Sequence, residues 1–218
     1  LYIRWGVMPV TYIAKHHKIL SRLDNPFKLI ADIFYIIKAK FYQKLKLVKP
    51  FEIVFAAGQS CMSDNYCTKI VPINLCDFDN HKILINSRLG RLVKEKYAVY
   101  LDTFLPFQSD LKVDNRPVVT PDLFYSSLNH FFQLIEKKYK VKVVIAAHPK
   151  SDYKTGVFNG RQVLYGHTPR LVKDSEYVIT EMSTAVSYAV INRKPLFFIY
   201  NDEMNVIYKD SVVHEIKS

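Results

Sequence analysis

The sequence predicts an α/β fold made of two Rossmann-like, parallel-sheet domains. Short apolar runs alternate with amphipathic segments along most of the chain, and the runs stop at polar or glycine-containing turns. Apolar strands separated by helices are typical of a parallel sheet covered by helices. The pattern restarts near residue 97, which divides the chain into domains 1–97 and 98–218.

The composition is that of a folded globular protein. Of 218 residues, 49% are hydrophobic and 23% charged, which is enough to build a core. The formal net charge of +11 favours anionic ligands such as phosphates. No run of 18 apolar residues occurs, so we expect no membrane-spanning helix. Cys61, Cys67 and Cys76 lack metal-site spacing, and we expect reduced thiols in a cytoplasmic protein.

In the first half, residues 10–49 lack glycine and repeat apolar positions at spacings of three and four, which predicts helix. We expect strands at 51–57 and 68–75, a polar turn at 77–80, a short apolar run at 82–86 and a basic helix at 89–96. The chain begins at Leu1 soon before a strand-like run, so we expect this first domain to be incomplete.

The second half shows the alternation more regularly. Apolar runs predict five strands, at 98–101, 141–147, 161–164, 177–180 and 195–200. Amphipathic segments predict three helices, at 122–138, 168–173 and 183–191. Asp122 is suited to the first turn of its helix.

Ligands of parallel sheets bind beyond the carboxyl ends of the strands, so the residues after each run are the candidates for a site. They are Asp102 and Thr103, then His148, Pro149 and Lys150, then Gly166, His167 and Thr168, and finally Glu181, Met182, Ser183 and Thr184. A strand-end histidine suits an anion, although it also serves as a simple strand cap. Ser183 and Thr184 at a helix start suit a phosphate, although ordinary N-capping explains them too.

A family resemblance strengthens the phosphate interpretation. The stretch 174–185, its continuation to Phe198 and the upstream His148-Pro149 step resemble the donor-binding half of bacterial surface-polysaccharide transferases. Groups with this His-Pro step and a Ser-Ser/Thr pair include the polysialyltransferases, the capsule Kdo transferases and the teichoic acid glycerophosphotransferases. The resemblance covers about residues 98–200.

The resemblance implies a fold of GT-B type, with two domains facing each other around donor and acceptor. It implies a glycosyltransferase whose donor, a CMP-linked sugar, is a substrate and not a cofactor. No Asp-x-Asp pair is evident in a donor loop of the second half, so we expect the enzyme to be metal-independent. His148, Ser183 and Thr184 would hold the donor phosphate, aided by Pro149 and Lys150, and the loop 166–168 would lie near the base. The acceptor would be an oligosaccharide or a lipid-linked sugar at the inner face of the bacterial membrane.

A transferase also needs a base that deprotonates the acceptor hydroxyl. Asp77, Asp79 and Asp102 are the candidates. The Asp77-x-Asp79 spacing also fits a metal-binding pair, although a solvated turn explains it better. Where the families that this chain resembles often carry Asp before the serine pair, this chain has Glu181, whose role stays open.

The basic helix suggests a further contact. Lysines and aromatic residues mix from Lys28 to Lys49, as in helices that lie on anionic lipid, although a solvated face over an aromatic core explains the same pattern. The alternatives to a transferase are a nucleic-acid-binding module, a sugar-nucleotide epimerase and a non-catalytic relic. No nucleic-acid-binding motif supports the first of these, so we expect no nucleic-acid partner.

Overall fold

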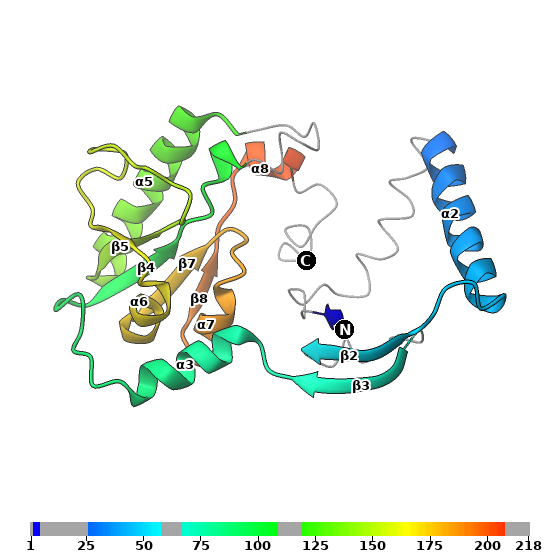
Figure 1. Cartoon of the computed structure of the whole chain (residues 1–218). Coiled ribbons are helices and arrows are strands. Elements are labelled where there is room, and N and C mark those ends of the chain that lie inside the picture. Colours follow the sequence, from blue (N-terminus) through cyan, green and yellow to red (C-terminus); the bar gives the residue numbers. More distant parts are fainter. Residues whose placement is uncertain (1, 5–25, 58–66, 109–118, 208–218) are drawn as a thin grey trace. The chain divides into compact units, whose positions relative to one another are not determined.

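The computed structural model describes residues 2–4, 26–57, 67–108 and 119–207 (Figure 1). These residues belong to two compact units, one ending at Leu75 and the other formed by Cys76–Ile207. The division follows Leu75, and not residue 97 as the sequence suggested. The reason is that residues 76–96 pack against helices of the second unit.

The first unit contains a parallel sheet in the order β1-β2-β3. Its strands are β1 (Tyr2–Arg4), β2 (Phe51–Ala57) and β3 (Cys67–Ile73), which confirms the strand expected at 51–57. Helix α2 (Pro26–Lys44) lies within the segment expected to be helical, and residues 10–25 lie outside the described part. Among the described helices, none has the length and apolarity needed to cross a membrane.

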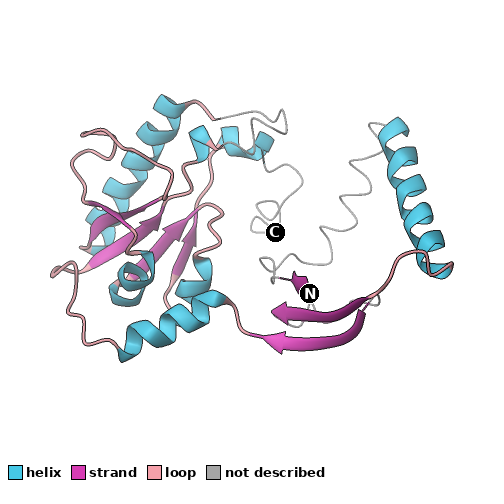
Figure 2. Ribbon diagram, in the orientation of Figure 1, coloured by secondary structure: helices cyan, strands magenta, loops and turns pink. Residues whose placement is uncertain are grey.

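The second unit contains a five-stranded parallel sheet in the order β6-β5-β4-β7-β8. Figure 2 shows its strands in magenta with helices beside them. All five strands predicted in the second half are confirmed, four of them with shifted ends. They are β4 (Tyr97–Leu101), β5 (Lys142–Ala147), β6 (Val163–Tyr165), β7 (Tyr177–Thr180) and β8 (Leu196–Phe198). The chain is therefore an α/β protein with parallel sheets.

The helices of the second unit cover opposite faces of this sheet (Figure 1). Helix α5 (Pro121–Tyr139) covers one face, where Phe132 packs against the Tyr100 ring at 5.1 Å. Helices α3 (Cys76–Asn86), α6 (Thr168–Asp174) and α7 (Val186–Ile191) cover the other. This arrangement follows from the connections, because α5 links β4 to β5 on one side of the central strand, whereas α6 links β6 to β7 on its other side.

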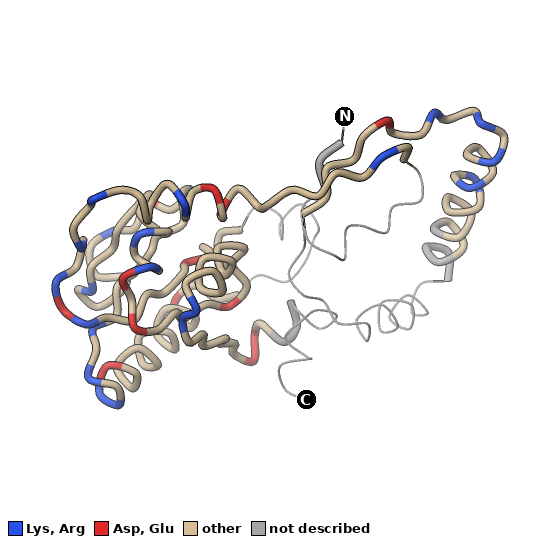
Figure 3. Tube along the Cα trace, turned by 90° about the horizontal axis from the view of Figure 1, so that it is seen from below, with Lys and Arg blue, Asp and Glu red and all other residues tan. Residues whose placement is uncertain are grey.

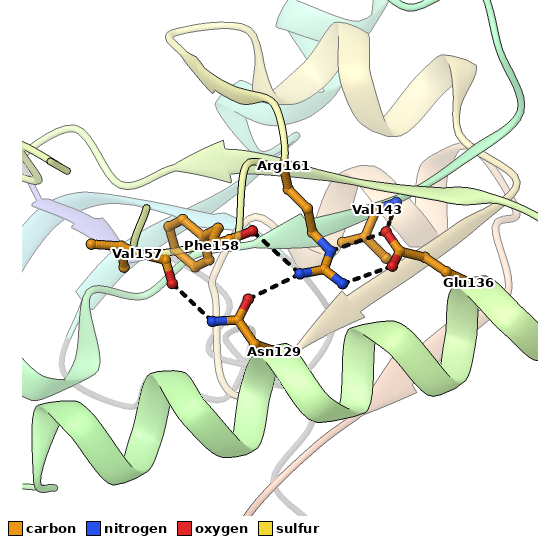
Figure 4. A network of polar contacts seen from close by, with 6 residues as sticks. All are labelled: Asn129, Glu136, Val143, Val157, Phe158 and Arg161. Carbon is orange, nitrogen blue, oxygen red and sulfur yellow. Dashed lines mark hydrogen bonds and ion pairs between the residues drawn. The ribbon is translucent and has the colours of Figure 1, made fainter. Parts of the chain in front are cut away.

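A polar network fastens α5 to the segment before β6 (Figure 4). The Arg161 guanidinium donates to both carboxylate oxygens of Glu136, at 3.0 and 2.7 Å, and to the Asn129 side-chain oxygen at 3.0 Å. The Arg161 side chain is only 8% exposed and lies over the Phe132 ring. The ion pair is therefore a largely buried tie between two elements.

Residues 76–96 differ from the prediction. The expected turn at 77–80 and apolar run at 82–86 form one helix, α3, and the expected helix at 89–96 is not helical. Asp77 and Asp79 lie in the first turn of α3, where carboxylates favour the helix dipole. The sequence also missed α8 (Asp202–Ile207) and the 3-10 turn Leu105–Phe107, η2.

Candidate functional site

The strand order of the second unit creates a crevice beside its central strand. β4 lies between β5 and β7, and the connections to these neighbours run over opposite faces of the sheet. Ligands of doubly wound sheets bind at such a switch point, beyond the carboxyl ends of the strands. Asp102 follows β4 there, and Glu181 follows β7.

His148 and Ser183 lie at the same edge of this sheet. His148 directly follows β5, and Ser183 comes three residues after the end of β7. Because β4 is the single strand between β5 and β7, the two strand ends are roughly 10 Å apart. The structure thus brings together the two motifs on which the phosphate interpretation depends.

The His148 ring has a fixed orientation. Its Nδ1 accepts a hydrogen bond from the Lys150 backbone N–H at 3.1 Å, so the proton of the neutral ring is on Nε2. The ring stacks on Phe104 with 6.1 Å between centroids and 13° between planes. Pro149 and Lys150 are exposed in a turn that the Ser151 N–H closes on the His148 carbonyl. His148 therefore presents a single N–H donor at the strand end.

The Asp102 carboxylate organises this part of the crevice. Oδ1 accepts from the Phe104 N–H, and Oδ2 accepts from the His148 N–H and the Tyr153 hydroxyl, at 2.9, 2.9 and 2.7 Å. The residue is 5% exposed, and burial raises its pKa. Three donors surround this candidate base, so its contacts suit positioning better than proton abstraction.

Phe104 carries backbone strain at the same place. Its φ of 53° is left-handed, a conformation that non-glycine residues seldom adopt. The bond from its N–H to Asp102 holds the loop, and the Phe104 ring then stacks on His148. Strained residues of this kind cluster at functional sites.

Glu181 is a buried acid beside the crevice. It is 2% exposed, and its carboxyl oxygens accept hydrogen bonds from the Tyr100 hydroxyl and, at 3.4 Å, from the Thr103 hydroxyl. Burial raises its pKa to about 8, with a smaller contribution from the Asp102 charge. Glu181 therefore holds a proton at neutral pH. The signal in the sequence is an acidic residue placed directly after an apolar strand.

Ser183 and Thr184 do not cap a helix as expected. Helix α7 begins only at Val186, and its N-cap residue, Ala185, makes no side-chain cap. Instead, the Ser183 hydroxyl accepts from the Ala185 N–H at 3.2 Å, and the Ser183 N–H donates to the Thr180 hydroxyl oxygen at 3.2 Å. The pair thus forms a turn that links β7 to α7, with Thr184 exposed.

Asp77 lies beside this turn and not in a separate half. The Ser187 hydroxyl donates to the Asp77 carboxylate and is also 3.2 Å from the Thr184 carbonyl oxygen. The contact joins α3 to α7, together with a hydrogen bond from the Asn80 amide to the Tyr188 hydroxyl at 3.2 Å. The structure therefore groups Asp77 with the Ser183–Thr184 turn, whereas Asp79 is exposed on α3.

The loop 166–168 lies at the same edge but farther away. Gly166 follows β6 with a φ of 71°, a conformation that suits glycine, and Thr168 is the first residue of α6. β5 and β4 lie between β6 and β7, so this loop is three strand spacings from the Ser183–Thr184 turn.

Across the described ranges, no group of three or more His, Cys, Asp or Glu side chains is arranged to hold a metal ion. Comparison of the chain with protein-family models, with curated proteins and with solved structures found no match.

Proposed function

We propose that this chain is a glycosyltransferase that moves a sugar from a nucleotide-activated, CMP-linked donor to a cell-surface polysaccharide or lipid-linked acceptor. The observation that carries the proposal is the placement of His148 and the Ser183–Thr184 turn at one edge of the sheet, on either side of the switch-point crevice. A crevice of this kind is where nucleotides bind in doubly wound folds.

The donor phosphate would bind between these two groups. The Nε2–H of His148 and the Thr184 hydroxyl supply neutral donors, and Lys150 adds a positive charge. Donors placed in advance around a leaving phosphate stabilise the charge that develops on it during transfer. Asp102 and Phe104 would keep the His148 ring in its orientation.

Asp77 is the base that we favour among the three candidates. Its carboxylate lies beside the Ser183–Thr184 turn, whereas Asp102 is enclosed by donors. In the GT-B arrangement that we propose, the unit ending at Leu75 binds the acceptor. The reaction would take place on the cytoplasmic side of the membrane.

Nucleotide binding to a matched pair of variants tests the proposal. We expect isothermal titration calorimetry to show CMP binding, and His148→Ala to weaken it at least about tenfold by removing a phosphate donor. Lys142→Ala is the control, because Lys142 is exposed at the opposite end of the same strand. Equal CMP affinity in both variants, or binding of an oligonucleotide but of no nucleotide, would contradict the proposal.

Helix α2 supports a peripheral contact with anionic membrane as part of this proposal. Large apolar residues that share one helical arc are exposed in the described structure, namely Ile30, Ile33, Phe34, Ile37 and Phe41. Lysines lie in the second half of the helix and just after it, and the sequence has no acidic residue between Lys38 and Lys49 (Figure 3). Apolar residues with flanking lysines suit the surface of an anionic bilayer.

Cosedimentation with phosphatidylserine vesicles tests this contact. Replacing Lys38, Lys40 and Lys44 by Gln should reduce the bound fraction, because each basic residue near the surface contributes about 1 kcal/mol. The same change at Lys137, Lys138 and Lys140, at the end of α5, is the control. Equal loss in both triple variants would attribute the binding to net charge alone and would contradict a role for α2.

A further inference from the structure

A cavity of about 350 Å³ opens between α5, the ends of β7 and β8, and α8. Its walls include four aromatic side chains, Phe124, Phe131, Phe198 and Tyr200. Glu181 lines it as well, and Ser127 of α5 lies at its rim. Mostly apolar walls with a few convergent polar groups are typical of small-molecule sites, and the volume is within their usual range.

The buried carboxyl restricts the charge of a ligand. Glu181 is 2% exposed, and burial raises its pKa to about 8, so at neutral pH it offers an O–H donor and a carbonyl acceptor without a net charge. Its neighbours include Tyr100 of β4, Tyr125 of α5 and Asp102, which directly follows β4. Burial raises the pKa of both tyrosines, so they stay neutral, whereas the Asp102 charge helps to raise the pKa of Glu181. A further negative charge is therefore unfavourable beside Glu181, and an anionic ligand would bring one.

We propose that this cavity, which we call the Glu181 pocket, binds an uncharged six-membered ring. The flat aromatic walls suit the face of such a ring, because stacking and apolar contact need a flat partner. The Glu181 carboxyl suits a ring edge that carries a hydroxyl or N–H group. A nucleobase and a neutral pyranose share this chemistry.

The Glu181 pocket is separate from the groups assigned to the phosphate. It lies on the α5 face of the sheet, whereas α7 and the contacts of Asp77 lie on the other face. β8 and β6 are opposite edges of the sheet, so the pocket is also distant from the Gly166–Thr168 loop. The inference rests on the pocket alone and holds whether or not the chain transfers sugars.

A pair of adjacent serines tests the inference. Ser126 and Ser127 are both exposed on α5, and of the two only Ser127 lines the cavity. Ligand-observed NMR on the full chain, with up to about 10 mM cytidine or methyl N-acetylglucosaminide, covers the weak affinities of single rings. We expect one of these probes to bind, Ser127→Phe to lower its affinity at least about tenfold, and Ser126→Phe to leave it unchanged.

The two probes separate the sources of the ring. Binding of cytidine alone identifies a nucleobase, and binding of the glycoside alone identifies a sugar. If neither probe binds the unsubstituted chain, or if Ser127→Phe binds as well as Ser126→Phe, the inference is wrong. CMP binding that depends on His148 would survive that result, so the proposed function fails or succeeds separately.

A second variant tests the role of the Glu181 carboxyl without filling the cavity. Glu181→Gln retains a neutral donor and acceptor at every pH, whereas the Glu181 carboxyl loses its donor above about pH 8. The affinity of the unsubstituted chain should therefore fall from about pH 7 to about pH 9, and that of the variant should stay constant. The same fall in both proteins would exclude Glu181 from the site.

Discussion

Folding changes the proton affinity of Glu181, and this gives stability a defined pH dependence. Burial raises its pKa from 4.5 to about 8, so the folded chain holds a proton that the unfolded chain releases between these values. The free energy of unfolding should fall by up to about 1.4 kcal/mol for each pH unit across this window. Glu181→Gln lacks the contribution and should gain stability relative to the unsubstituted chain as pH rises.

Urea denaturation of both proteins at about pH 5.5 and about pH 8 measures the difference. Asp102, whose pKa burial also raises, is present in both proteins, so its contribution largely cancels. If the stability difference between the two proteins stays constant over this range, Glu181 is ionised in the folded chain.

Single residues of the site could be predicted only up to their place along the chain. His148 stands at a strand end because an apolar run stops there, and the sequence shows this directly. The backbone N–H of His148 donates to the Asp102 carboxylate, and these two residues are 46 positions apart in the sequence. The contact of Asp77 with Ser187 spans 110 positions. Such contacts depend on strand order and helix packing, which local patterns do not specify.

At the scale of elements, the tie between α5 and the segment before β6 should be a major source of stability. Arg161→Ala would leave Glu136 without its bidentate partner in a mostly buried setting. Removal of one partner of a buried pair costs about 3–5 kcal/mol. Lys142→Ala removes the exposed ion pair with Glu95 and should cost under about 1 kcal/mol.

Chemical denaturation of the two variants, side by side, checks this difference. Arg161→Lys should recover only part of the loss, because an ammonium cannot reproduce the two parallel bonds of the guanidinium. A loss in Arg161→Ala no larger than in Lys142→Ala would show that the network contributes little.

Elements with strong patterns were predicted well, and those shaped by packing were not. The strands β4, β5 and β7 are buried in the sheet, and their continuous apolar runs indicate this in the sequence. Helix α3 has no buried residue, so its apolar positions show no clear helical period in the sequence. It is held by contacts to α6 and α7, which become visible only once those helices are in place.

At the scale of the whole molecule, the division after Leu75 predicts which fragment folds. Residues 76–207 should unfold cooperatively on their own, because they form one compact unit. A fragment that starts at Tyr97 loses α3 and Val93, which pack on Tyr188 and on the rest of this core. Its melting temperature should be lower by about 10 °C.

Circular dichroism melts of the two fragments measure this difference. Equal melting temperatures would show that residues 76–96 do not stabilise this unit, as the domain boundary near residue 97 predicts. Retention of CMP binding by residues 76–207 would further show that the donor site lies within this unit.

The proton on Glu181 also affects how the intact chain moves in an electric field. The formal net charge of +11 counts Glu181 as an anion. Because Glu181 is protonated in the folded chain at pH 7, it makes the net charge one unit more positive than this formal value. By the isoelectric point near 9.4 the proton has been lost, and focusing experiments will not detect it. Native electrophoresis at neutral pH will detect this proton. Glu181→Gln should leave the mobility unchanged, whereas replacing an exposed glutamate by Gln should increase the mobility toward the cathode.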